Sequence, residues 1–402
     1  MPFFKYKART SESKIVAGLV EAPAKDGAVK LLREKSLFVV ELSETKAGTA
    51  ASKMAQFKRV KFGDVVNFTR QLATMITAGL SLPESLTILR SQTNNQALAQ
   101  MLQNIEHEIM GGGNLADALA RYPQTFPPIY VALVGAGEAS GSLDQVLTRL
   151  AETLEAQREF RGKIIGALIY PVIILIGMVV VVMIMMVVVI PKLTELYRDF
   201  GITLPFSTRL LMAISSFFVN YWILMILGTA AASIAFARWK KTPVGEYMVD
   251  SAVLRIPVFG DLQKKVILVE FTRTLGMLIS SGIHILEGLR ILKGALTNVR
   301  FRTAIDEISE KVEKGFSLGD SFAQYEMFPP IVSQMMKVGE ETGRLDETMG
   351  KLSKYFQSET EHLVKGLTTA IEPIIMVILG VGVGFIVMSV ITPIYNLTSQ
   401  FK

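Results

Sequence analysis

The chain has 402 residues, of which half are hydrophobic, and its mean hydropathy of +0.39 is high for a water-soluble protein. It contains no cysteine, which excludes disulfides, thiolate nucleophiles and cysteine-ligated metal sites. The formal net charge of +6 is a modest basic excess of the kind that flanks membrane spans, so nucleic acid is not an expected partner. The first residues lack the apolar core of a signal peptide, and we expect the first domain to stay in the cytoplasm.

Residues 1–45 predict a small N-terminal α/β appendage. Short β-branched and aromatic runs predict strands, and an amphipathic run between them predicts a helix. These elements are expected, in chain order, at residues 3–8, 15–20, 24–35 and 38–42. Residues 46–62 are mostly small and polar, which predicts a linker.

The rest of the chain repeats itself at an offset of about 200 residues. The paired segments are 68–79 with 271–282, 126–128 with 328–330, and 137–144 with 339–346. Each copy then runs into a long apolar stretch. The chain is therefore interpreted as a tandem duplication of one unit, a soluble helical domain joined to a membrane span.

The repeated soluble domain is predicted to be all-helical. Apolar residues recur at 3.6-residue spacing along one face of its first helix, at Val65, Phe68, Leu72, Met75 and Ile76. Gly79 is placed to end that helix, and Ser81 to cap the next one. We expect two homologous cytoplasmic bundles of about six helices each, at residues 63–163 and 238–370.

Three stretches are long and apolar enough to cross a bilayer, so the fold class is an all-α polytopic membrane protein. The predicted transmembrane helices are residues 164–190, 210–237 and 371–392, with 191–209 and 393–402 as a short periplasmic loop and tail. The middle span has no counterpart in the repeat. It returns the chain to the first side, so both bundles face the cytoplasm, in agreement with the basic residues at the inner flanks such as Arg161, Lys163, Lys240 and Lys241.

No motif predicts catalysis or a cofactor. Gly315-Phe316-Ser317-Leu318-Gly319 matches the G-x-S-x-G pattern of serine hydrolases, but it lies between two predicted helices rather than after a strand. We interpret it as a turn that links helices. The sequence lacks a G-x-x-x-x-G-K-[ST] phosphate-binding loop, so any nucleotide energy must come from a partner.

Carboxylates recur beside a glycine turn in both copies. Glu138 and Asp144 flank Gly141 in the first copy, and the second copy repeats the pattern at Glu340, Gly343 and Asp346. Three roles remain open for these acids. They can bind basic residues of a partner, Glu138 and Asp144 can hold a divalent cation through oxygen ligands, or they can cap helices.

Two further features concern membrane packing. Gly380 and Gly384 form a G-x-x-x-G pattern inside the last span, which predicts a close helix–helix contact within the protein or between copies. Pro171 and Pro373 are candidates to kink the junction between each bundle and its span.

In combination these motifs resemble the inner-membrane platform proteins of type IV pili and type II secretion systems, the PilC/GspF family. The likeness is carried by Phe68-Thr69-Arg70-Gln71-Leu72, Phe126-Pro127-Pro128 and Gly137 to Asp144, each with its second-copy echo. The resemblance implies a non-enzymatic homo-oligomer that contacts a hexameric cytoplasmic assembly ATPase, pilin or pseudopilin subunits, other inner-membrane assembly proteins and the lipid bilayer. The candidate interaction residues are Arg70, Glu138, Gly141 and Asp144, with their counterparts Arg273, Glu340, Gly343 and Asp346.

The leading hypothesis is therefore a platform that couples ATPase motion to the extraction and polymerisation of pilins. Two rivals are a transporter built from parallel repeats, which needs polar or broken helices at the midplane, and an intramembrane protease, which needs acids inside the spans. Glu372 lies only at the edge of a span. The sequence does not separate a pilus from a secretion or competence machine.

Overall fold

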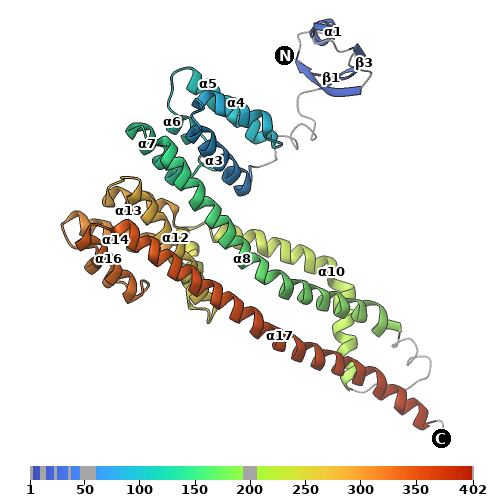
Figure 1. Ribbon diagram of the computed structural model, residues 1–402. Coiled ribbons are helices and arrows are strands. Elements are labelled where there is room, and N and C mark those ends of the chain that lie inside the picture. Colours follow the sequence, from blue (N-terminus) through green and yellow to red (C-terminus); the bar gives the residue numbers. More distant parts are fainter. Residues whose placement is uncertain are drawn as a thin grey trace. The chain divides into compact units, whose positions relative to one another are not determined.

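The computed structural model describes residues 3–9, 15–21, 25–34, 38–45, 60–192 and 206–400. Helices dominate these residues, as the sequence predicts (Figure 1). The chain divides into two compact units, residues 1–114 and 115–402, which are described in turn. The division falls within the stretch predicted as the first bundle.

The N-terminal part of the first unit is a three-stranded antiparallel sheet with one helix. Its elements are β1 (Phe3–Arg9), β2 (Ile15–Glu21), α1 (Lys25–Glu34) and β3 (Phe38–Thr45). The strand order is β2-β1-β3, with β1 in the centre and its register shifted opposite β3 between Lys7 and Ala8. Ala8 and Leu32 are buried, so the helix and the central strand each contribute to a small core.

Among its described residues, the first unit also contains the helices α3 (Phe62–Thr77), α4 (Leu82–Gln92) and α5 (Gln96–Met110). Local chemistry sets their ends. Gly79 adopts a φ of 87°, and the Ser81 side chain accepts a hydrogen bond from the Glu84 N–H, as the sequence predicts. Asn95 caps α5 in the same way, through the N–H of Ala97.

The second unit begins with helices that lead into a membrane-length segment and ends with the complete second repeat. Its elements are α6 (Leu115–Ala120), α7 (Pro128–Ser140), α8 (Leu143–Ile184), η1 (Met185–Val189), α10 (Phe206–Trp239), α11 (Pro243–Arg255), α12 (Phe259–Ser280), α13 (Ile285–Ala295), α14 (Val299–Glu313), α15 (Leu318–Ala323), α16 (Pro330–Thr342) and α17 (Leu345–Gln400). The longest are α8 and α17, which continue as helices through Pro171 and Pro373 (Figure 1).

The repeated Phe-Pro-Pro motif anchors the core and starts a helix in each copy. The Phe328 ring lies 5.4 Å from the rings of Phe271 and Phe301 and 4.8 Å from that of Phe322, measured between centroids. Pro330 is the first residue of α16, where a missing N–H costs no helical hydrogen bond. Phe126 is likewise fully buried, two residues before α7 begins at Pro128.

Two helices of the described chain are long and apolar enough to cross a membrane, namely the one containing α8 and η1 and the one formed by α17. The segments Ile223–Trp239 and Pro243–Arg255 form a third candidate if they count together as one span, although their axes turn by 103° at the break between them. Many large apolar side chains on these helices are exposed, Ile173 and Val377 among them. Lipid is the environment that suits such surfaces.

Candidate functional site

The repeated glycine turn is a tight corner between two helices. Gly141 ends α7 and Gly343 ends α16, and both adopt a φ of 69°, in the left-handed region that favours glycine. In each copy the next residue donates its N–H to the carbonyl of Gly137 or Gly339, at 2.9 Å. This backbone pattern closes the C-terminus of the short helix and starts the long helix α8 or α17.

A second glycine in each motif lets the two helices of the corner approach closely. A Cβ added at Gly339 would lie 2.9 Å from the Leu345 Cα and 2.4 Å from the Thr348 hydroxyl oxygen. At Gly137 the nearest atom would be the Cβ of Val146, at 3.0 Å. Glycine is therefore required at Gly339 by contact with the following helix, and less strictly at Gly137.

The repeated glutamate caps the start of a short helix, α6 or α15, that comes just before the helix ending at the corner. The Glu138 carboxylate accepts the N–H groups of Leu115 at 2.6 Å and of Ala116 at 2.8 Å, at the start of α6. Glu340 accepts the N–H of Leu318 at 2.9 Å, at the start of α15. A carboxylate is well placed there because free N–H groups and the helix dipole both favour negative charge.

The two repeated aspartates occupy the first turn of the long helices. Asp144 and Asp346 are half-buried and begin α8 and α17, where an acid interacts favourably with the helix dipole. In the part of the chain that the structure describes, no three His, Asp or Glu side chains gather in a geometry suited to a metal ion. The divalent site at Glu138 and Asp144 stays a prediction, although both Glu138 oxygens already accept backbone hydrogen bonds.

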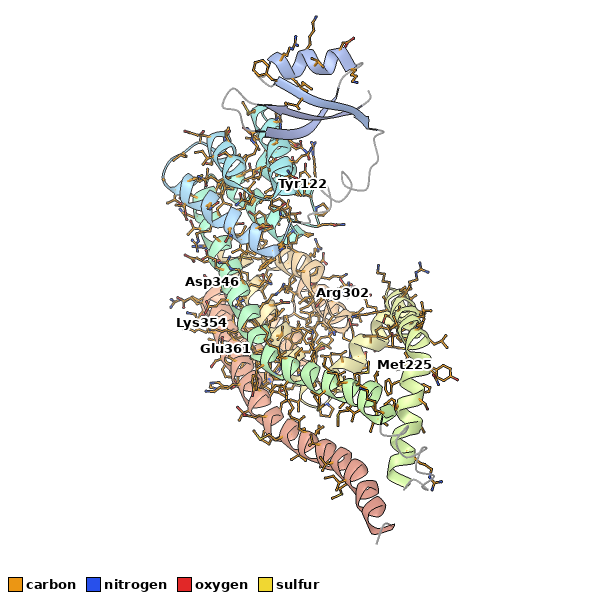
Figure 2. All side chains as sticks on the ribbon, turned by 90° about the vertical axis from the view of Figure 1, so that its right-hand side faces the viewer. Tyr122, Met225, Arg302, Asp346, Lys354 and Glu361 are labelled. Atoms are coloured by element: carbon orange, nitrogen blue, oxygen red, sulfur yellow. The ribbon has the colours of Figure 1, made fainter. Side chains whose placement is uncertain are left out.

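Below the second corner lies a groove between α8, α12 and α17, which we call the three-helix groove. Its volume is about 380 Å³, and both charge signs line it. The lining includes Arg149 and Glu152 of α8, Arg273 and Gly276 of α12, and Asp346, Lys354 and Gln357 of α17. Figure 2 shows Asp346, Lys354 and Glu361 following one another along α17 beside α8. The groove is thus lined by the long helix of the first repeat and by two helices of the second.

Arg273 is held by two neighbours in this groove. One of its guanidinium nitrogens donates to the Gln357 side-chain oxygen at 2.7 Å, and the guanidinium carbon lies 5.8 Å from the centre of the Phe160 ring. Within the described residues its Nη1 is buried without a hydrogen-bond partner. Burial lowers the pKa of Arg273, while the nearby Glu270 carboxylate raises it. Its first-copy equivalent, Arg70, lies half-buried on α3.

Three ion pairs below the groove connect its helices in every pairwise combination. They are Arg161 of α8 with Glu270 of α12 at 2.9 Å, Lys163 of α8 with Glu361 of α17 at 3.2 Å, and Lys265 of α12 with Glu359 of α17 at 2.9 Å. The hydrogen bond to Glu361 raises the pKa of Lys163, and hydrogen bonds from Gln357 and then Lys163 lower the pKa of Glu361. We call these residues the ion-pair belt.

Sequence reasoning missed the belt and most of the groove. Of the belt and the groove, the repeated motifs singled out only Arg273 and Asp346 as interaction residues. Arg161 and Lys163 were noted only as basic flanks of a span, although Lys163 and Glu361 also recur at the 202-residue offset, as Lys365 and Glu159. The helical spacing of Gln357 and Glu361 was a usable signal, because residues four apart share a face. Nothing in the sequence, however, identifies α8 as the helix opposite that face.

The glycines predicted to pack the last span have no neighbour in the described chain. A Cβ added at Gly380 or Gly384 would meet nothing within 4 Å. It stays a prediction that this face packs against a second molecule of the protein or against another protein.

Comparison with known proteins identifies relatives along the whole chain. The family model described as type II secretion system (T2SS), protein F matches residues 68–191 and again 271–393, and the model for the N-terminal domain of that protein matches residues 1–43. The type IV pilus assembly protein PilC of Thermus thermophilus is 37% identical over 402 residues, covering 99% of this chain and 98% of the relative. PilC of Pseudomonas aeruginosa is 33% identical, covering 85% and 91%, and the type II secretion system protein F of Xanthomonas campestris is 30% identical, covering 99% of both. The two family matches coincide with the internal duplication.

Proposed function

The chain belongs to the type II secretion system protein F family, and from this premise we propose that it is the inner-membrane platform of a type IV pilus or type II secretion machine. In this role it catalyses no reaction. It receives displacement from a cytoplasmic assembly ATPase and transmits it to the membrane, where pilins or pseudopilins are extracted and polymerised.

The observation that carries this proposal is the continuity of the long helices. The helix α17 comprises 56 residues without interruption, from the glycine corner at its start to the apolar segment that holds Gly380 and Gly384. At 1.5 Å per residue such a helix is roughly 80 Å long. Displacement of its cytoplasmic end is therefore displacement of its membrane end, as expected of a mechanical element.

The ion-pair belt supports the same reading. It ties α8, α12 and α17 together just before α8 and α17 become apolar. Single exposed ion pairs contribute little, but three pairs among three helices form a network that resists independent sliding. The membrane segments of the two copies are then expected to move together.

The proposed partners follow from what the chain carries and lacks. Its sequence has no phosphate-binding loop, so the energy source is a separate ATPase. The face around Gly380 and Gly384 is a candidate for packing against pilin helices or other copies. Relatives named for type IV pilus assembly and for type II secretion support the choice of machine class.

We further propose that both bundles are cytoplasmic. The natural absence of cysteine makes this directly testable, because a single engineered cysteine is the only possible site of thiol labelling. Thr303 is exposed on α14. In intact cells a Thr303→Cys protein should not react with a membrane-impermeant maleimide, and it should react after the cells are opened. Labelling of intact cells would contradict the topology.

The mechanical role is tested at Gly366, an exposed residue of α17 whose Cβ position is empty. Gly366→Pro removes a helical hydrogen bond and kinks the helix between the bundle and the span. We expect this variant to accumulate in the membrane and retain the ATPase in a pull-down, yet to lose pilus assembly or secretion in a deletion strain. Gly366→Ala is the matched control and should retain full activity.

Two outcomes would contradict the proposal. If Gly366→Pro assembles pili or secretes normally, then continuity of α17 is not needed. If the unaltered protein retains no assembly ATPase in pull-downs and its deletion leaves assembly intact, then the chain is not a platform of this kind.

A further inference from the structure

The helix α11 docks on the second bundle with its polar face. Glu246 forms an ion pair with Arg302 of α14, and the Asp250 carboxylate accepts the Val299 N–H at 2.8 Å, at the start of α14. Leu254 packs against the buried core of the bundle. These contacts use the acidic side of the helix, which is the side that would normally face water.

A second face of α11, next to the docking face, carries large apolar side chains that are uncovered in the described chain. Val244, Tyr247 and Met248 are 66%, 54% and 55% exposed, and their three- and four-residue spacing places them on one stripe. Exposed apolar residues continue past the end of the helix to Phe259. Exposed apolar side chains gathered along one helix and the turn after it mark an interaction surface, because a soluble protein rarely leaves such groups in contact with water.

The position of α11 along the chain indicates what covers this patch. Only residues 240–242 separate α11 from α10, and the two axes turn by 103°. If α10 crosses the membrane, a helix turned through about a right angle at its end runs along the membrane surface. In Figure 2, where Met225 marks α10, the chain turns from the end of this helix toward Arg302.

The residues at the turn are those that favour a lipid interface. Arg238, Lys240 and Lys241 are exposed and make no ion pair in the described structure, and Trp239 is 42% exposed beside them. Tryptophan prefers the headgroup region, and clustered cations are attracted to anionic lipids of the cytoplasmic leaflet.

We propose that α11 is an interfacial helix, with the stripe of Val244, Tyr247 and Met248 inserted at the boundary between headgroups and acyl chains. Arg238, Lys240 and Lys241 bind anionic headgroups, while Glu246 and Asp250 hold the second bundle. The inference rests on the proposed membrane location of α10. Deep insertion of α11 as half of a broken span is disfavoured, because both acids are engaged by the bundle. The helix thus fixes the second bundle against the membrane.

The cysteine-free sequence permits a depth measurement on the full-length protein. Single-cysteine variants Met248→Cys, Leu227→Cys and Thr303→Cys would each carry an environment-sensitive fluorophore in nanodiscs of phosphatidylethanolamine and phosphatidylglycerol. Quenchers are nitroxide lipids labelled near the headgroup or deep in the acyl chain, and aqueous iodide. We expect the headgroup nitroxide to quench position 248 most strongly, the deep nitroxide position 227, and iodide position 303.

The three positions separate failure of this inference from failure of its premise. If position 227 is not quenched by the deep nitroxide, α10 is not a span and the premise fails. If position 227 is quenched but position 248 behaves like position 303, the premise stands and the interfacial helix is overturned. If position 248 escapes every quencher, a protein surface covers the patch, which also overturns the lipid assignment.

The headgroup contact has its own test. Phosphatidylglycerol that copurifies with the detergent-solubilised protein would be counted by mass spectrometry for the unaltered chain and for Lys240→Gln with Lys241→Gln. Each lysine near an anionic surface corresponds to roughly a fivefold change in affinity, so bound phosphatidylglycerol should fall clearly in the double variant. Lys314→Gln, at an exposed position on the loop after α14, is the matched control and should change nothing. Unchanged binding in the double variant would overturn the headgroup assignment.

Discussion

The two glycine corners have the same backbone but different side-chain chemistry. Gly141 and Gly343 share a φ of 69°, and both corners are closed by a 2.9 Å hydrogen bond to the carbonyl of Gly137 or Gly339. Ser142 of the first copy corresponds to Arg344 in the second, and Arg344 forms an ion pair with Glu347. What the duplication has kept is the path of the chain into a long helix, whereas the exposed side chains differ.

The corners also differ in how tightly they are built. The second leaves less room at its buried glycine, and the first engages its capping glutamate more fully. Substitutions made in pairs, one in each copy, therefore separate packing from capping. In each case the readout is the unfolding midpoint of the full-length protein in detergent, followed by circular dichroism.

The largest difference between the copies is expected from Gly339→Ala and Gly137→Ala. Alanine improves helix propensity by up to about 1 kcal/mol at either position. At Gly339 the new Cβ would lie 2.9 Å from the Leu345 Cα, and the overpacking should outweigh that gain and destabilise the protein by about 2 kcal/mol. At Gly137 the two effects should nearly cancel. Equal midpoints for the two variants would show that the corners are packed alike.

The capping glutamates should respond in the opposite order. Glu138→Gln replaces one of two carboxylate oxygens that accept backbone N–H groups with an amide nitrogen, and this should cost about 1 kcal/mol. Glu340→Gln keeps an oxygen for the one N–H of Leu318, and the side chain is more exposed, so the cost should be smaller. A larger loss at Glu340 would contradict this order and would show that its carboxylate stabilises the fold through more than the bond to Leu318.

The left-handed glycines should show no difference between the copies. Gly141→Ala and Gly343→Ala each force an alanine into a conformation that costs roughly 1 kcal/mol, and neither new Cβ meets an atom within 4 Å. Asparagine tolerates this region better, so Gly141→Asn and Gly343→Asn should lose less. Unequal losses for the two alanine variants would mean that the conformational strain of alanine differs between the two positions although their φ angles are the same.

Comparison of the copies also explains which features the sequence could predict. The recurring motifs predicted two homologous domains. Single residues predicted the helix ends, such as Ser81 before α4 and the left-handed Gly79. The turn at Gly315 was also predicted correctly, because this glycine adopts a φ of 87° between α14 and α15 and Ser317 caps α15. All these features depend on residues close together in the chain.

The role of Glu138 and the three-helix groove depend on distant residues. Glu138 was recognised as recurrent, but its partners Leu115 and Ala116 lie 23 and 22 positions earlier, and no periodicity indicates that the chain folds back there. The pairing of Lys163 with Glu361 spans 198 positions. Local spacing does not determine which helices pack together, because many charged helical faces are equally compatible with water.

The smallest expected effect concerns the ion-pair belt. It separates the contribution of an ion pair between the two sequence repeats from that of an ion pair within the second repeat. Lys163 and Glu361 join α8 of the first copy to α17 of the second, whereas Lys265 and Glu359 lie within the second copy. The pKa of Glu361 is lowered from its ordinary value of 4.5, so its contribution is present above that pH and is lost as pH falls through the lowered value.

The pKa of Lys163 is raised from 10.5, so its contribution is complete below that pH and is lost as pH rises through the raised value. Stability should therefore be flat between about pH 5 and 10 for this pair, with a shallow loss on each side.

Glu361→Gln should flatten the acid limb below pH 4.5 relative to the unaltered protein, and added salt should reproduce part of that change by screening an exposed pair. Glu359→Gln is the control within one copy. Coupling of the two long helices is measured as the quenching of labels placed on α8 and on α17. If these labels respond independently in Glu361→Gln but not in Glu359→Gln, the ion pair between the two repeats is the one that keeps the helices moving together. An acid limb that persists unchanged in Glu361→Gln would remove this pair from the coupling.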